Sequence, residues 1–255
     1  VYAALRWQEI LKIAGIEVGT LKLFLYSLIG NFYGIVLPGG KVAGDVMCAY
    51  RFTKDLNDNG QGRKYFISVF ADRILGMLTM ALFLSFYFII KSPVIFVFNS
   101  YTWLIGTFLI TRSLLGLAFM FFPVFDFLIG WLGKIPVKSL RGLCESLLTA
   151  FRVVRRAPQK IATAILISSI SVFLNLVSMY VLGRAVGLEA DFWIIGFSYL
   201  ASTLLISIPV TLAGIGLREG GAVFVLVNAG NDLHKSAALS IIALIVLIIY
   251  SAVGG

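Results

Sequence analysis

The sequence has little charge. Asp, Glu, Lys and Arg make up 13% of its 255 residues, while hydrophobic residues make up 60%. A soluble globular domain has roughly twice that share of charged residues, about a quarter. So few charges do not cover a surface that faces water on every side. The composition therefore excludes an ordinary soluble domain and indicates a protein that lies largely in lipid.

Groups that bind metals and nucleotides are also scarce. His234 is the only histidine, and the cysteines Cys48 and Cys144 do not form a CxxC pair. We interpret the cysteines as small core residues rather than a disulfide or a metal site. The GxxxxGK[ST] loop that holds nucleotide phosphates is absent, as are HxxxxD, GxSxG and DxD patterns. We therefore expect no cofactor, and any transport to be passive, ion-coupled or partner-driven.

Uncharged apolar runs of at least 20 residues recur along the chain, at 92–111, 161–183, 192–217 and 236–255. A helix needs about 20 mostly apolar residues to cross the hydrocarbon core of a bilayer. The runs lack the strict alternation of a barrel strand. The sequence therefore predicts an all-α polytopic membrane helix bundle, with residues 1–255 forming a single transmembrane domain. Because the chain starts at Val1, we expect it to lack one or more N-terminal helices of a longer protein.

The formal net charge of +9 is concentrated in two loops between apolar runs, 51–64 and 134–160. In a soluble protein this charge would suggest nucleic acid as a partner, but in a membrane protein basic loops mark the cytoplasmic side. We expect both loops to face the cytoplasm of a prokaryotic plasma membrane. Apolar residues at helical spacing predict a basic amphipathic surface helix within 134–160, which can gather anionic lipids. Residues 1–14 are expected to form another interfacial helix, anchored by Trp7.

Proline and glycine interrupt two of the apolar runs. The run 20–37 ends at Pro38 and Gly39, and the run from residue 192 breaks at Pro209; glycines and ionisable residues follow both breaks. Backbone exposed to lipid costs several kcal/mol, so such breaks occur only against protein or a wet cavity. Two interrupted segments in the two halves of a transporter indicate a site at the membrane midplane. We therefore predict two re-entrant helices related as inverted repeats, with a site between them.

The ionisable residues beside the breaks are expected to pair, because an isolated charge inside a bilayer costs about 2.5–3.5 kcal/mol. Charge and placement suggest that Asp45 pairs with Arg218, and that Glu219 pairs with Arg51 or Arg73. The alternative is that both breaks are ordinary loops at the membrane interface, with their charges in water.

Three motifs surround these residues. They are Asn31 with Pro38-Gly39 and Gly44-Asp45, then Asp72-Arg73-Ile-Leu-Gly76, and finally Pro209 with Gly214-Ile-Gly216-Leu-Arg218-Glu219. In this order and spacing they resemble the lysylphosphatidylglycerol synthase transmembrane-region family, also called flippase-like domain proteins, over nearly the whole chain. The opening Leu5-Arg6-Trp7 fits as well. Two positions depart from the family pattern: Ala43 replaces a glycine, and Cys48 stands where an arginine is usual, with Arg51 as the next basic residue.

The resemblance implies a membrane domain with two re-entrant elements that moves a lipid between leaflets. We expect an anionic phospholipid or an isoprenoid-linked (glyco)lipid, such as a lipid-linked sugar, as the substrate, and no nucleic acid as a partner. Oligomers are compatible with the sequence. The residues predicted to bind the substrate are Asn31, Pro38, Gly39, Gly44, Asp45, Arg51, Asp72, Arg73, Pro209, Gly214, Gly216, Arg218 and Glu219.

Two other functions stay open. One is a membrane-embedded transferase that modifies a lipid, in which Asp45 or Glu219 would serve as a base. The other is a membrane scaffold for a partner enzyme, in which Asp45 and Arg218 would tolerate neutral replacement. The absence of familiar catalytic patterns favours a transporter, so we predict no catalytic residue and no metal ligand.

Overall fold

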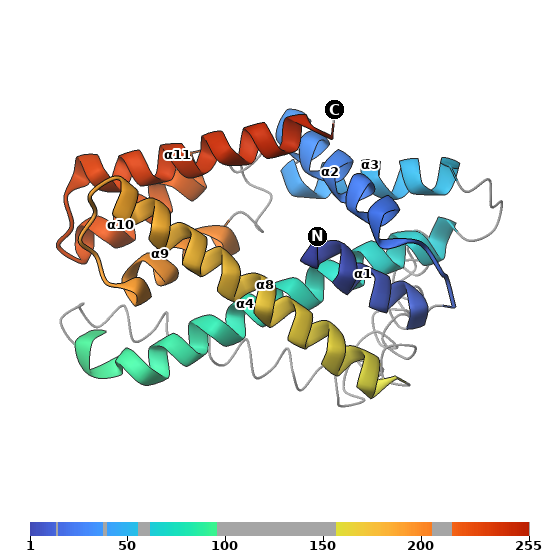
Figure 1. Cartoon of the computed structure of the whole chain (residues 1–255), viewed down its shortest axis with the longest axis horizontal. Helices are drawn as coiled ribbons and strands as arrows, with labels where there is room; N and C mark the ends of the chain where they lie inside the picture. Colours follow the sequence, from blue (N-terminus) through green and yellow to red (C-terminus); the bar gives the residue numbers. More distant parts are fainter. Residues whose placement is uncertain (14, 38–39, 56–61, 96–156, 206–215, 255) are drawn as a thin grey trace, which may run out of the picture.

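The computed structural model describes residues 1–13, 15–37, 40–55, 62–95, 157–205 and 216–254. Within these ranges all regular secondary structure is helical, which confirms the predicted all-α class. The helices (Figure 1) are α1 (Tyr2–Ile13), α2 (Thr20–Val36), α3 (Gly40–Asp55), α4 (Gly62–Ile95), α8 (Pro158–Ala185), α9 (Phe192–Leu205), α10 (Leu217–Asn228) and α11 (Leu233–Ala252).

Some predictions fall on residues outside the described ranges. They concern the apolar run at 92–111 beyond residue 95, the basic amphipathic segment up to residue 156, and the break residues Pro38, Gly39, Pro209 and Gly214.

Three described helices are long and apolar enough to cross a bilayer: α8, α11 and the part Ile67–Tyr87 of α4. The apolar helices α2 and α9 are shorter. Large apolar side chains are exposed along α8 and α11, among them Phe173, Val181, Ile245 and Ile249. Lipid tails are the natural neighbours of such surfaces, since large exposed apolar patches are rare in soluble monomers. The described helices therefore agree with the predicted membrane bundle.

Contacts along α4 and α8 show that these two helices run in the same direction. Leu75 of α4 lies in one buried cluster with Ile161 of α8. Further along both helices, Leu84 lies in another cluster with Leu176. We call the side of the bundle where α4 and α8 begin side A, and the side where α8 ends side B.

The helices α2 and α3 form an antiparallel hairpin. The Tyr26 hydroxyl in α2 donates a hydrogen bond of 2.9 Å to Asp55, the last residue of α3. Phe52 of α3 packs edge-on against Tyr65 near the start of α4, with ring centroids 4.5 Å apart. The open end of the hairpin therefore lies on side A, and the turn between its helices lies away from that side.

Glycines bring the backbones of this hairpin into contact. A carbon added to Gly44 of α3 would lie 2.1 Å from the carbonyl oxygen of Gly30 and 2.8 Å from the backbone nitrogen of Gly34, both in α2. Small residues spaced in this way allow membrane helices to pack closely. On another face of α2, a carbon added to Gly254 would lie 2.3 Å from the carbonyl carbon of Leu28. The backbone of α2 is thus held between α3 and the end of α11.

The helices α9 and α10 form a second hairpin, which opens toward side B. Ile195 in the first turn of α9 lies against Gly183 at the end of α8. Leu226 near the end of α10 shares a buried cluster with Ile195 and with Leu239 near the start of α11. The two hairpins therefore open toward opposite sides. Each contacts a long helix of the other half of the chain, since α9 contacts α4 and α2 contacts α11 (Figure 1).

The prediction that Trp7 anchors an interfacial helix is wrong. Trp7 is only 4% exposed, and its indole N–H donates to Ser68 Oγ at 3.0 Å. Ala4 and Leu11 are buried with it in one cluster, and α1 packs against α2, α4 and α8. A short helix with one apolar face suits either a membrane surface or a protein groove, so its sequence pattern alone does not separate the two.

We expect Gly44→Ala to destabilise the α2–α3 hairpin. Its added carbon would lie 2.1 Å from the Gly30 carbonyl oxygen, so the backbones must separate, at a cost of about 1–3 kcal/mol. Thermal unfolding of the purified protein in detergent measures this loss. Gly220→Ala is the matched control because nothing lies within 4 Å of its added carbon. Equal melting temperatures for the two variants would contradict the close packing.

Candidate functional site

The first charged centre joins three helices through Arg6 of α1. Its Nε and Nη2 donate to the two carboxylate oxygens of Asp72 on α4, at 2.6 and 2.7 Å, and its Nη1 donates to Ser168 Oγ on α8 at 2.6 Å. Only 12% of the Arg6 side chain and 15% of the Asp72 side chain are exposed. Burial alone would lower the pKa of Arg6, but the charge and hydrogen bonds of Asp72 raise it above its usual value. The Arg6–Asp72 salt bridge therefore links α1 to α4, and the bond to Ser168 extends this link to α8.

Gly76 explains the spacing of the Asp-Arg-x-x-Gly motif. It lies one turn after Asp72 on the same face of α4, and a carbon added to it would lie 2.8 Å from Arg6 Nη1. A side chain at this position would press on the guanidinium. The glycine therefore leaves the room that Arg6 needs to reach Asp72.

The second charged centre joins α3 to α4. Arg73 Nε donates to Asp45 Oδ2 at 2.7 Å, and Arg73 Nη2 donates to Asp45 Oδ1. The predicted pairing of Asp45 with Arg218 is therefore wrong, because Asp45 is held by the residue that follows Asp72. Neighbouring residues of a helix point about 100° apart. For this reason Asp72 reaches α1 and Arg73 reaches α3 from the same turn of α4.

The departure from the family pattern at Cys48 does not leave Asp45 without a basic partner. Cys48 is buried, with its Cβ 3.1 Å from the position of a carbon added to Gly30. The space between α2 and α3 at this position therefore suits a small residue. Arg51, the next basic residue, is exposed and lies 3.8 Å from Asp55 on its own helix. The basic partner comes instead from α4.

The third charged centre lies at the start of α10. Arg218 Nε donates to Glu219 Oε1 at 3.1 Å, and Glu219 Oε2 accepts the backbone N–H of Gly216 at 2.8 Å. Glu219 thereby satisfies an amide at the helix N-terminus, where amides have no partner within the helix. The predicted pairing of Glu219 with Arg51 or Arg73 is wrong, since Glu219 pairs with its sequence neighbour.

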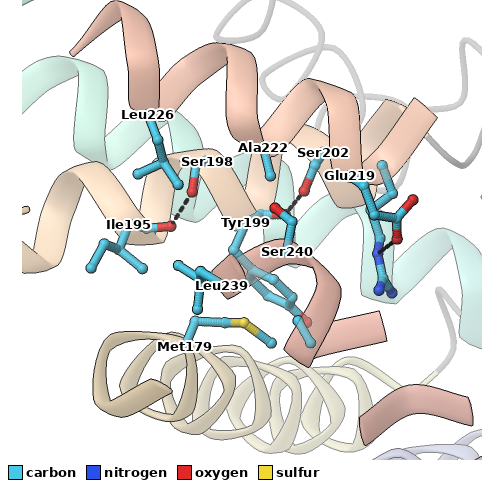
Figure 2. A pocket seen from close by; sticks show the side chains of 12 residues that line it. Met179, Ile195, Ser198, Tyr199, Ser202, Glu219, Ala222, Leu226, Leu239 and Ser240 are labelled. Atoms are coloured by element: carbon cyan, nitrogen blue, oxygen red, sulfur yellow. Dashed lines mark hydrogen bonds and ion pairs between the residues drawn. The ribbon is translucent and has the colours of Figure 1, made fainter. Parts of the chain in front are cut away.

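A small cavity of about 40 Å³, open to the solvent at its mouth, lies beside this third centre. Side chains from α8, α9, α10 and α11 converge on it (Figure 2). Its lining combines the apolar side chains of Met179, Leu226 and Leu239 with the polar ones of Ser202, Arg218 and Ser240. Arg218 Nη2 and Ser240 Oγ are buried without a hydrogen-bond partner in the described part of the chain. Buried polar groups are normally satisfied, so these atoms mark a place for a polar ligand atom or water.

The structure distributes the predicted site residues over the two hairpins. Asp45 and Arg73 meet at the first hairpin, while Gly216, Arg218 and Glu219 meet at the second. Where the chain is described, α3 and α10 make no contact with each other, so the two groups form separate centres. Asn31 and Gly44 lie within the α2–α3 hairpin. No described segment brings together three His, Cys, Asp or Glu side chains that could hold a metal ion.

Sequence reasoning missed Arg6, Ser168 and Ser240 as members of these centres. Arg6 lies within residues 1–14, which the sequence predicts as an interfacial helix, although the match of Leu5-Arg6-Trp7 to the family pattern is a signal that its position matters. Ser168 and Ser240 are isolated hydroxyls in apolar runs. Such serines commonly bond to their own helix backbone, so the sequence carries no signal that would single them out.

The chain is similar to known membrane proteins. The family model described as Lysylphosphatidylglycerol synthase TM region matches residues 1–254. The UPF0104 membrane protein PH1989 of Pyrococcus horikoshii is 26% identical over 256 residues, which cover 92% of this chain and 76% of that protein. No solved structure matches the chain.

We expect Asp72→Asn to destabilise the protein because it leaves the Arg6 guanidinium without a charged partner. Removing one member of a buried pair costs about 3–5 kcal/mol, and the low end applies here since both side chains keep some exposure. Unfolding in detergent measures the loss, and a double-mutant cycle with Arg6→Gln isolates the coupling between the two residues.

Glu9→Gln is the control on the same helix. Glu9 pairs with Lys12, whose side chain is 40% exposed, and exposed pairs contribute about 0–1 kcal/mol. Additive losses in the Arg6 and Asp72 double variant would show that the two residues do not stabilise α1 jointly.

Proposed function

The chain belongs to the lysylphosphatidylglycerol synthase transmembrane-region family, and on that premise we propose that this multi-pass membrane protein moves a lipid between leaflets. The proposed substrate is an anionic phospholipid or an isoprenoid-linked (glyco)lipid. The observation that carries the proposal is the pair of hairpins that open toward opposite sides of the bundle. The second helix of each carries a carboxylate that pairs with an arginine: Asp45 of α3 pairs with Arg73 of α4, and Glu219 of α10 pairs with Arg218 of the same helix.

In the proposed arrangement the two hairpins are re-entrant helices. α2 and α9 are apolar but shorter than the three candidate spans, and each is followed by a helix that returns toward the side where its hairpin opens. In the proposed arrangement the halves α1–α4 and α8–α11 are inverted repeats, as in many secondary transporters. The contacts between helices support this arrangement when α1 to α4 are matched in order with α8 to α11. The contact of α1 with α2 then corresponds to that of α8 with α9, and the contact of α3 with α4 corresponds to that of α10 with α11. Between the halves, the contact of α4 with α9 corresponds to that of α11 with α2.

The charged centres suit a path for a lipid headgroup. Asp72 lies five residues after Ile67, where the apolar part of α4 begins, which corresponds to a depth of about 8 Å at the rise of a helix. Charges at such depth are usually paired or face a cavity. We assign side A to the cytoplasm, because the basic loops 51–64 and 134–160 both precede helices that begin there.

The transferase alternative has less support. It needs Asp45 or Glu219 as a base, and in the structure donors engage both carboxylate oxygens of each residue. Neither carboxylate has an oxygen free of a donor in this arrangement, which suits the positioning of helices better than contact with a substrate.

Lipid exchange between leaflets of proteoliposomes tests the proposal. Fluorescent phosphatidylglycerol should exchange faster with the full-length protein than in protein-free vesicles. Asp45→Asn and Arg218→Gln should each slow the exchange at least about tenfold, because each removes charge-assisted hydrogen bonds of about 1.5–3 kcal/mol.

Arg184→Gln is the matched control for loss of an arginine, since Arg184 is exposed and contacts only Tyr180 of its own helix by a described hydrogen bond. It should exchange lipid at the parent rate. Exchange by the parent no faster than in protein-free vesicles would contradict the transport function and favour the scaffold or the transferase. Parent-rate exchange in Asp45→Asn and Arg218→Gln, with normal insertion, would contradict the role proposed for these two residues.

A further inference from the structure

The cavity lined by α8, α9, α10 and α11, which we call the α8–α11 cavity, has two hydrogen-bond donors among its lining residues that lack an acceptor in the described part of the chain. They are Arg218 Nη2 on α10 and Ser240 Oγ on α11, both fully buried. Both residues line the same cavity, although they come from different helices. Of the buried side-chain atoms without a partner in the described ranges, the remaining one is Ser251 Oγ, which does not line the cavity.

Ser240 differs from the other serines beside the cavity. Ser198 and Ser202 donate to backbone carbonyl oxygens of their own helix, at 2.7 and 2.9 Å (Figure 2). Ser236, one turn before Ser240 on α11, does the same at 2.7 Å. This local bond is the usual way for a helical serine to satisfy its hydroxyl in an apolar setting. The Ser240 hydroxyl makes no such bond to a described residue, although Ser240 lines the cavity.

Arg218 also differs from the other arginines of the charged centres. All three nitrogens of Arg6 donate hydrogen bonds to Asp72 or Ser168. Arg73 holds Asp45 through two of its nitrogens. Arg218 bonds to Glu219 through Nε, and its buried Nη2 has no acceptor in the described residues. Its guanidinium therefore keeps a buried nitrogen that can donate a further hydrogen bond to an oxygen ligand.

We propose that the α8–α11 cavity binds a phosphate group through Arg218 Nη2 and Ser240 Oγ. That the phosphate belongs to a phospholipid headgroup rests on the proposed function. Arg218 and Ser240 are the residues that would hold this headgroup. The guanidinium plane matches the geometry of a phosphate, whose oxygens accept several charge-assisted hydrogen bonds at once. A single neutral carbonyl would satisfy these two donors less well.

Glu219 does not prevent an anion from binding here. One carboxylate oxygen is engaged by Arg218 Nε and the other by the backbone N–H of Gly216. The positive end of α10 also lies at this point, and it favours a negative charge. The apolar lining from Met179, Leu226 and Leu239 suits the first carbons of a lipid.

Binding to the full-length protein in non-ionic detergent tests the proposal by calorimetry. The probes are dioctanoyl phosphatidylglycerol, dioctanoylglycerol, which lacks the phosphate, and inorganic phosphate. Dioctanoyl phosphatidylglycerol should bind the parent more tightly than dioctanoylglycerol. Arg218→Gln should weaken its binding at least about tenfold, and Ser240→Ala at least about threefold, as expected for the loss of one charged and one neutral hydrogen bond.

Two controls match the test variants. Arg184→Gln removes an exposed arginine outside the cavity, and Ser251→Ala removes the other buried, unpartnered serine of α11. Both should change the affinity less than about twofold. Arg218→Lys keeps the charge beside Glu219 but removes the planar group, so it should fold normally and still lose affinity. Equal losses in the controls and the test variants, or no preference for the lipid with phosphate, would overturn the proposal.

The results also separate this site from the proposed function. Tight binding of inorganic phosphate without phosphatidylglycerol, if it depends on Arg218 and Ser240, supports the phosphate site and contradicts a lipid as its source. Arg218-dependent lipid binding without any leaflet exchange supports the site while the transport function fails. If the protein exchanges lipid between leaflets but Arg218→Gln and Ser240→Ala leave its lipid affinity unchanged, this inference is overturned while the transport function stands.

Discussion

A charge buried among apolar helices is costly unless a partner lies within hydrogen-bond reach, and α4 carries two such charges at adjacent positions. Asp72 holds Arg6, while Arg73 holds Asp45. Because neighbouring helical residues point about 100° apart, these pairs fix different elements to the same turn of α4. One pair places α1 against α4 and α8, and the other places the α2–α3 hairpin. The four charges cancel, so the cluster can lie inside the bundle without a net charge.

The two hairpins are held by different means. The first is fixed by the Asp45–Arg73 pair and by direct backbone packing at Gly30, Gly34 and Gly44. At the second, no described residue lies within 4 Å of a carbon added to Gly216 or Gly220, and its charged pair lines a cavity. In the described structure the first hairpin is therefore tightly packed, while the second has room for a ligand.

The sequence alone was sufficient for the fold class and the family, because both depend on local features. Apolar runs near 161–183 and 236–255 predict α8 and α11 directly, and the motif around Asp72 and Gly76 is short and ordered. The ion pairs were not predictable in the same way. Asp45 and Arg73 are 28 positions apart, and Arg6 and Asp72 are 66 apart, so their pairing depends on how α4 is rotated. A single sequence does not give the rotation of α4 about its axis. For this reason charge and placement beside the breaks led to the wrong prediction that Asp45 pairs with Arg218.

The contacts between the halves connect the two charged regions. α9 of the second hairpin packs on α4, where Tyr87 and Phe197 stack with ring centroids 5.0 Å apart, and α4 also carries Arg73. A displacement of the second hairpin along α4 therefore acts on the helix that holds Asp45. Coupling between two sites must be reciprocal. In the proposed transport cycle, a headgroup bound at Arg218 would change the free energy of opening the Asp45–Arg73 pair. Opening that pair would change the free energy of headgroup binding by the same amount. In the described residues the two hairpins make no contact with each other, whereas α4 contacts α3 and α9, and α11 contacts α2 and α10, so such coupling would pass through these two long helices.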